Sequence, residues 1–186
     1  MRSAPGRFGA FGTVLVTVGL LVGVAGSPAG AATGRPFVNH SSGKCLEIAD
    51  WRTDNGAPAR QWDCTGGANQ KWVFANSDGA LAIVNVNSGK CLEIADWRKD
   101  NGAPARQWDC TGGANQKWQY MEVGPGIPAD SHTAEYLLNL NSALLLEIAD
   151  WRTDNGAPAR QWIYGGSRQA NMEWSYCSNW PGCMTD

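Results

Sequence analysis

The chain has 186 residues, with 15 basic and 17 acidic side chains and a formal net charge of −2. That length suits one domain, or a few small repeats that share a core. A charge this close to zero, with no visible basic stripe, argues against a nucleic-acid partner.

The first segment, residues 1–31, has the pattern of a secretory signal peptide. A basic start precedes residues 11–24, which are almost wholly apolar, and small residues follow. This pattern predicts cleavage near Ala31 or Ala32. A membrane anchor is the alternative, but the apolar run is shorter than the ~20 residues that a spanning helix needs. We therefore expect a secreted, extracellular protein without a membrane span.

The rest of the chain is built from copies of one block. Residues 42–72 and residues 88–118 are identical except for one substitution, and residues 147–162 match residues 47–62 at every position. Self-similarity of this kind indicates a repeat architecture.

Within each repeat, short segments of apolar or alternating pattern are separated by turn sequences. In the first copy, residues 45–48 and 59–64 read as strands, and Asp54-Asn55-Gly56 reads as a turn. No segment shows a sustained helical period. Units this short cannot each enclose a core, so the three tandem repeats must share one. The sequence thus predicts an all-β fold with threefold pseudosymmetry. The repeats are expected at about 37–74, 82–120 and 136–176.

Three motifs recur in register: Cys-Leu-Glu-Ile, Gln-Trp-Asp-Cys and Asn-Gln-Lys-Trp. Together they resemble the ricin B-type (R-type) β-trefoil lectins, which carry a Gln-x-Trp signature. Gln70-Lys71-Trp72 and Gln116-Lys117-Trp118 fit that signature, whereas the third copy reads Met172-Glu173-Trp174. The resemblance covers residues 37–176 and implies a β-trefoil that binds carbohydrate and needs no cofactor.

Cysteine spacing suggests a disulfide in each of the first two repeats. An exported protein favours disulfides over free thiols. Cys45 and Cys64 have the same separation as Cys91 and Cys110. Spacing alone leaves open which of the 15 possible pairings of six cysteines is formed.

The third repeat and the tail support this pairing. Leu145 and Tyr164 stand where the two cysteines would be, and a bonded pair is expected to be lost together. Cys177 and Cys183 then remain for each other, in a small loop within the tail at residues 177–186. We expect no metal site, since Cys and His are not clustered at ligand spacing.

Strand alternation brings three polar and aromatic side chains together in each repeat. Glu47 shares a face with Cys45, and Arg60 and Trp62 share a face with Cys64. If the two cysteines are bonded, the three side chains converge. An indole can pack against the C–H face of a pyranose while a carboxylate accepts hydrogen bonds from hydroxyl groups. This combination predicts a sugar pocket.

The family resemblance points to the same places, through its acidic, aromatic and Asn positions. Arg60, Gln70 and their equivalents join the candidate site from the same blocks. The candidate carbohydrate-binding residues are Glu47, Arg60, Trp62, Asn69 and Gln70; Glu93, Arg106, Trp108, Asn115 and Gln116; and Glu147, Arg160, Trp162 and Asn171. The family more usually has Asp at the acidic position and a polar amide at the position of Arg60. The preferred sugar therefore stays open.

Each assignment has a structural alternative. Glu47 and Arg60 could form a partly exposed salt bridge worth about 0 to 1 kcal/mol. Trp62 could serve packing, and Gln70 could belong to the core or to the pocket. Trp51 could cap the core or wall the pocket. The expected core residues are Leu46, Ile48, Trp72, Trp118 and Trp174.

The third repeat has lost its cysteines and the Gln of the signature, yet residues 147–162 are unchanged. A binding face would explain this identity, and so would recent copying of DNA. We favour the binding face.

These observations predict a secreted lectin with up to three sites for a polysaccharide or glycoconjugate, monomeric and without catalysis. The alternative is a protein-binding trefoil or protease inhibitor that acts through the 121–133 loop. A triplicated pocket block argues against such a single loop. An enzyme is disfavoured because His40 and His132 lie outside the repeated sequence blocks, and a glycosidase needs two carboxylates across a cleft. Glu47 and Asp50 are the candidate acids for that activity.

Overall fold

The structure is a computed structural model. It describes Met1 and residues 34–77, 79–122 and 135–177. The chain divides into two units, residues 1–31 and residues 32–186. Among the described residues, no helix is long and apolar enough to cross a membrane. The predicted signal peptide, most of the 121–133 loop and the tail beyond Cys177 lie outside the described residues.

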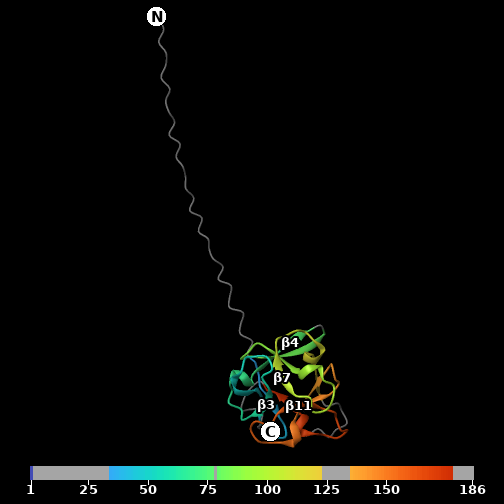
Figure 1. The fold of residues 1–186 in the computed structure, drawn as a ribbon. Helices are drawn as coiled ribbons and strands as arrows, with labels where there is room; N and C mark the ends of the chain where they lie inside the picture. The colour runs from blue at the N-terminus through green and yellow to red at the C-terminus, as the bar shows by residue number, and fades with distance from the viewer. Residues whose placement is uncertain (2–33, 78, 123–134, 178–186) are drawn as a thin grey trace. The chain divides into compact units, whose positions relative to one another are not determined.

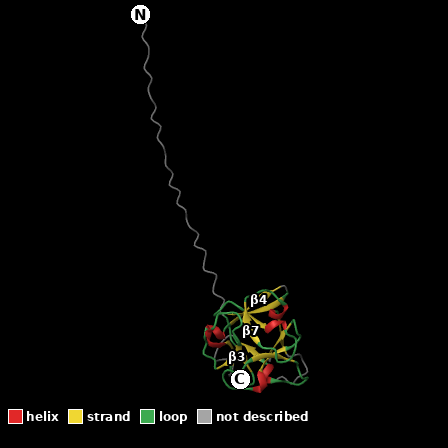
Figure 2. Cartoon of the chain, viewed as in Figure 1, coloured by secondary structure: helices red, strands yellow, loops and turns green. Residues whose placement is uncertain are grey.

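The described residues of the second unit form twelve short strands in three groups of four. Figures 1 and 2 draw these strands as arrows. The first group is β1 (Phe37–Asn39), β2 (Cys45–Ile48), β3 (Ala59–Trp62) and β4 (Trp72–Ser77). The second is β5 (Ala80–Asn85), β6 (Cys91–Ile94), β7 (Ala105–Trp108) and β8 (Trp118–Glu122). The third is β9 (Glu135–Asn139), β10 (Leu145–Ile148), β11 (Ala159–Trp162) and β12 (Trp174–Tyr176).

Two single-turn 3-10 helices accompany each group. They are η1 (Ala49–Trp51) and η2 (Ala68–Gln70), η3 (Ala95–Trp97) and η4 (Ala114–Gln116), and η5 (Ala149–Trp151) and η6 (Ala170–Met172). The first of each pair follows the second strand of its group, and the second precedes the fourth strand.

The second and third strands of each group form an antiparallel hairpin. The hairpins β2–β3, β6–β7 and β10–β11 have the same register, which pairs Glu47 with Arg60 in the first repeat. The first and fourth strands join the groups, since β1 pairs with β12, β4 with β5 and β8 with β9. The strands β4 and β5, which pair with each other, extend beyond the expected limits of the first two repeats. β4 continues to Ser77, past the expected end at residue 74, and β5 begins at Ala80, before the expected start at residue 82.

The three repeats share one core, as the sequence predicts. Leu46 and Ile48 point into it with no exposed surface. Trp72, Trp118 and Trp174 are also fully buried or nearly so. The core contains the equivalents of these residues from every repeat, together with alanines at the hairpin ends. Trp72 donates its indole N–H to the carbonyl of Leu46, at 2.9 Å, which satisfies the polar atom of a buried side chain.

The hairpins are also fastened to one another in a ring. Gln61 has no exposed surface, and its amide donates to the carbonyls of Arg152 and Asp154, at 2.9 and 3.0 Å. Gln107 makes the equivalent bonds to the first repeat, and Gln161 to the second. The glutamine of each repeat therefore bonds the turn of the preceding repeat, and the first repeat closes the ring by bonding the third.

A second contact in this ring ends the third strand early. The N–H of Asp63 bonds Oδ1 of Asn155, at 2.9 Å, instead of continuing the hairpin ladder. The strand β3 therefore ends at Trp62 rather than at the expected residue 64. Part of the identity of residues 147–162 with the other copies thus has a structural cause, since the turns and strands of different repeats must fit one another.

Both predicted disulfides within the repeats are confirmed. Cys45 bonds Cys64 and Cys91 bonds Cys110, each with Cα atoms 5.1 Å apart. Cys183 lies outside the described residues, so its pairing with Cys177 stays a prediction.

An apolar cluster stands in place of the disulfide in the third repeat. Leu145 packs with Tyr136 and Met172, and all three are buried. Tyr164 lies edge-on to Tyr136, with ring centroids 5.8 Å apart. Side-chain packing thus connects the segments that a covalent bond joins in the other repeats.

Candidate functional site

A nearly buried carboxylate occupies the centre of each candidate site. Glu47 on β2 is 4% exposed, and its register partner Arg60 on β3 donates from Nε to Glu47 Oε1, at 2.9 Å. The same guanidinium donates from Nη2 to Asp50, at 2.9 Å. The carboxylate of Asp50 is 70% exposed, so the ion cluster runs from the protein interior to solvent.

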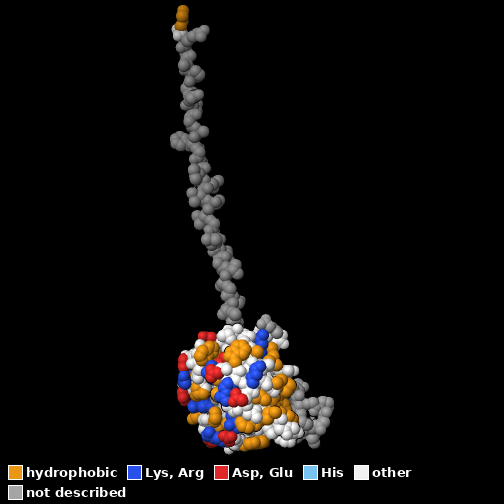
Figure 3. Space-filling view, turned by 45° about the vertical axis from the view of Figure 1, so that its right-hand side comes forward, with side chains coloured by type: hydrophobic (Ala, Val, Ile, Leu, Met, Phe, Trp, Pro, Cys, Tyr) orange, Lys and Arg blue, Asp and Glu red, His pale blue; other side chains and the backbone are white. Residues whose placement is uncertain are grey.

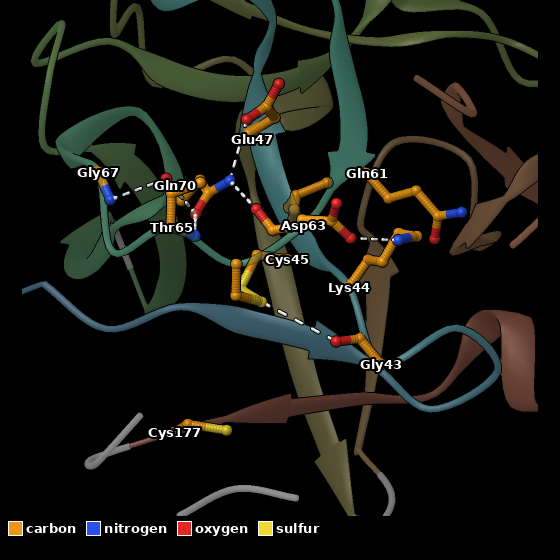
Figure 4. The surroundings of a disulfide bond; sticks show 12 residues. Gly43, Lys44, Cys45, Glu47, Gln61, Asp63, Thr65, Gly67, Gln70 and Cys177 are labelled. Carbon is orange, nitrogen blue, oxygen red and sulfur yellow. Dashed lines mark hydrogen bonds and ion pairs between the residues drawn. A yellow bond between two sulfur atoms is a disulfide. The ribbon is translucent and has the colours of Figure 1, made fainter. Parts of the chain in front are cut away.

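Two amides complete the coordination of Glu47. Asn69 donates to Glu47 Oε2 at 3.2 Å and to the carbonyl of the last residue of β2. Gln70 donates to the same carboxylate oxygen at 3.0 Å and to the carbonyl of Asp63 at 2.8 Å, and its own oxygen accepts from Thr65 (Figure 4). Gln70 is 1% exposed, so it bonds the Glu47 carboxylate from the interior of the protein.

The predicted convergence of Glu47, Arg60 and Trp62 is present, and it includes the salt bridge that was its structural alternative. Arg60 also lies over the indole of Trp62, 4.4 Å from the ring centroid. One face of this half-buried tryptophan is thus occupied by a cation, an arrangement that is itself favourable. The other two repeats have the same stacking, at 4.5 Å.

The site of the second repeat reproduces the first, and the third differs in one donor. Arg160 donates to Glu147 at 2.7 Å and Asn171 donates at 3.0 Å, but Met172 stands where Gln70 is in the first repeat. Burial raises the pKa of Glu147, although Arg160 and Asn171 oppose this shift.

A pocket of about 220 Å³ opens over this cluster in the second repeat. Its lining residues are Glu93, Asp96, Trp97, Arg106, Trp108, Thr111 and Asn115. Gln116, although predicted as a site residue, lies behind this lining with 1% of its surface exposed. The pocket is therefore formed mainly by the predicted residues and by three others.

The three added residues are Asp96, Trp97 and Thr111. Trp97 corresponds to Trp51, whose two sequence interpretations are now resolved, because the indole is 55% exposed and forms a pocket wall. The triplication of the Asp-Trp pair was the sequence signal for the first two of these positions. Nothing in that pair indicated that both residues have positive φ, at 56° for Asp96 and for Trp97.

Each site contains one buried acceptor that lacks a partner. The side-chain oxygens of Asn69, Asn115 and Asn171 make no hydrogen bond within the described part of the chain. Buried polar atoms are normally satisfied. The same acceptor is therefore unpartnered at three symmetry-related places, one at each candidate site.

Comparison with known proteins agrees with the fold and the motifs. The model of the ricin-type β-trefoil lectin domain-like family matches residues 30–108 and 68–162. A sequence comparison with curated proteins gives no match.

Several solved structures are similar to the chain. A designed threefold-symmetric protein, ThreeFoil, is 30% identical, with a TM-score of 0.67 over 75% of this chain and 94% of that one. An exo-β-1,3-galactanase from Clostridium thermocellum is 30% identical, with a TM-score of 0.68 over 77% of this chain but only 29% of the galactanase.

A ricin B-like lectin from Macrolepiota procera, solved with lactose, shares the fold. Its TM-score is 0.62 at 14% identity, over 80% of this chain and 97% of that one. The family model spans well over half of the sequence, and the architecture has three repeats around one core. This chain is therefore a β-trefoil protein that belongs to the ricin-type lectin family.

Proposed function

We propose that this protein is a secreted, non-catalytic lectin that binds carbohydrate at up to three equivalent sites. The observation that carries the proposal is the pocket of the second repeat. There, the exposed indole of Trp97, the exposed carboxylate of Asp96 and the side chain of Asn115, whose oxygen is unpartnered, line one small cavity. Family membership points to the same class of ligand.

The chemistry of the lining suits a sugar. A hydroxyl group can donate to the exposed carboxylate of Asp96. Arg106 uses Nε and Nη2 for Glu93 and Asp96, so its Nη1 still has donors to offer. An indole supplies apolar surface for the C–H face of a pyranose. A few fixed polar groups beside an aromatic wall is the usual composition of a small-ligand site.

The carboxylates are arranged for binding rather than for hydrolysis. Glu47 and Asp50 both accept hydrogen bonds from the same guanidinium, that of Arg60. A glycosidase instead needs a proton donor and a base or nucleophile on opposite sides of the scissile bond. The galactanase match covers less than a third of that enzyme, so its activity does not transfer to this chain.

Three sites on one rigid body increase binding to a repeated ligand. Multivalent contact can increase avidity by about 10² to 10⁴ over a single site without any new contact. Weak individual sites would thus be enough on a polysaccharide or a glycan-coated surface.

The proposal is tested by screening residues 33–186 on a glycan array with Asp50→Asn/Asp96→Asn/Asp150→Asn as the matched variant. Asparagine tolerates positive φ at least as well as aspartate, so the fold is kept. Wild-type protein should bind a defined sugar, and the variant should bind at least roughly tenfold more weakly, because a charged hydrogen bond is lost. No binding by folded, oxidised wild-type protein would refute the proposal.

Two further measurements test the other parts of the proposal. Bound glycan should be recovered intact after prolonged incubation, since released fragments would indicate catalysis. N-terminal sequencing of exported protein should find a first residue near Ala32. Retention of residues 1–31 on the exported protein would contradict the predicted signal peptide.

A further inference from the structure

We propose that Trp51, Trp97 and Trp151 provide the aromatic surfaces on which the sugar stacks, and that the ligand is a neutral pyranose. The inference deepens the proposed function and rests on it. It moves the stacking role away from Trp62, Trp108 and Trp162, to which the sequence pattern assigned it.

The first argument concerns which indole is available. Arg60 already covers a face of Trp62, and Arg60 is fixed there by Glu47 and Asp50. A pyranose could reach that face only by displacing a guanidinium with two charged partners. Trp51 is 55% exposed, and its two equivalents are 55% and 53% exposed.

The second argument is that the backbone is strained to present this indole. Asp50 and Trp51 have φ of 55° and 56°, a region that side-chain-bearing residues rarely adopt. Asn87 of the next repeat donates to the carbonyl of Trp51 at 3.2 Å, and Asn141 donates to that of Trp97 at 3.0 Å. Strain of this kind is typical of ligand-contacting segments.

The third argument places the indole beside the open acceptor. A Cβ atom added to Gly67 would lie 2.7 Å from Trp51 Cζ2 and 2.7 Å from Asn69 Oδ1. Gly113 has the same relation to Trp97 and Asn115, at 2.8 Å from each. Only glycine permits this approach, which brings an indole edge and an unpartnered oxygen to one point of the pocket.

The charges of the site select against acidic sugars. Each pocket has two carboxylates and one guanidinium, for example Glu93, Asp96 and Arg106, and the most exposed of these groups is the carboxylate of Asp96. A sugar carboxylate or sulfate would meet this exposed negative group in a pocket of net negative charge. Lys and Arg side chains lie beside Asp and Glu side chains on the face seen in Figure 3.

The third repeat differs in the residue that precedes its second 3-10 helix. Gln169 precedes η6 at the position that Gly67 and Gly113 occupy before η2 and η4. A side chain therefore stands where the other two repeats need a bare glycine. We expect the first two sites to bind more tightly than the third.

The test compares three variants of residues 33–186 on the neutral glycan that the wild type prefers. They are Trp51→Ala/Trp97→Ala/Trp151→Ala, the same triple with Phe, and Val86→Ala/Leu140→Ala as a control at exposed apolar positions outside the pocket. The alanine triple should bind at least roughly tenfold more weakly, while the phenylalanine triple and the control stay within about threefold of wild type.

Two readouts separate binding from folding. The Tm of the alanine triple should stay close to that of the wild type, because the replaced indoles are exposed. Added sugar should protect the tryptophans of the wild type, but not those of the alanine triple, from acrylamide quenching.

The outcomes distinguish this inference from the function on which it rests. If the wild type binds no glycan, the proposed function fails and the inference fails with it. If the wild type binds and the alanine triple binds equally well, only the inference is refuted. A wild-type preference for sialylated, uronic or sulfated glycans would refute the assigned ligand class.

Discussion

Replacing Gln61 with leucine tests whether the ring of hydrogen bonds between hairpins stabilises the fold. Gln61 is fully buried, and its amide nitrogen bonds two carbonyls of the third repeat. Its oxygen accepts from Ser42 Oγ at 2.6 Å. Leucine has a similar volume and removes all three bonds without opening a large cavity.

The expected loss is the sum of these bonds. Each contributes about 1 kcal/mol net, and carbonyls left buried without a donor add to the cost. We therefore expect the free energy of unfolding to fall by about 3 kcal/mol. For a protein of this size, each kcal/mol lowers the Tm by about 2–4 °C, so the Tm should fall by about 6–12 °C.

Urea denaturation under non-reducing conditions, followed by tryptophan fluorescence, measures this change. Ser42→Ala is the matched control, since it removes one of the three bonds of Gln61 together with the bond from the Lys44 N–H to Ser42 Oγ, and should cost about 1–2 kcal/mol. Gln107→Leu should lose as much as Gln61→Leu, because its bonds to the first repeat are equivalent. A loss below about 0.5 kcal/mol for Gln61→Leu, or one no larger than that of Ser42→Ala, would refute the structural role of the ring.

Three further predictions concern single positions. Gly67→Ala should weaken sugar binding at the first site, measured in a chain whose other two sites are inactivated, because the new Cβ would collide with the Trp51 indole; unchanged binding would contradict this geometry. Burial raises the pKa of Glu135 to about 7, so the folded state keeps a proton that the unfolded state releases near pH 4.5. Stability should therefore fall as the pH rises from about 4.5 to about 7, and Glu135→Gln should flatten this slope in denaturation curves; an equal slope in both proteins would exclude Glu135 as its source. Met172→Gln should lower the free energy of unfolding by about 1–3 kcal/mol, because it places a polar amide in the buried apolar cluster of Met172, Tyr136 and Leu145; urea denaturation that finds a gain would show that Glu147 takes the new donor at no cost.

Strand periodicity was sufficient to predict the core and the main contacts of each site. Alternation sends Leu46 and Ile48 inward and brings Glu47 toward Arg60 and Trp62. These contacts are local to one hairpin, so its register fixes them. The cysteine pairing within the repeats followed from spacing and from the joint loss of both cysteines in the third copy.

Contacts between repeats could not be predicted in this way. Alternation places Gln61 on the face opposite Arg60 and Trp62, inside the protein, where a glutamine without partners would be costly. Its partners are carbonyls of a turn that lies far away in the sequence. The stacking of Arg60 on Trp62 was also hidden, because a β-strand pattern gives the face of a side chain but not its rotamer.

The identity of residues 147–162 with the other copies now has two separable causes. Asn155 and Gln161 bond other repeats, so the ring of hairpins constrains them whatever the protein binds. Asp150 is different, because the side chain that it bonds is Arg160 of its own repeat, and its carboxylate is 70% exposed. Trp151 is 53% exposed at an unfavourable φ of 55°. The ring of hairpins does not account for an exposed pair at an unfavourable φ, so we attribute its presence in every copy to the proposed ligand.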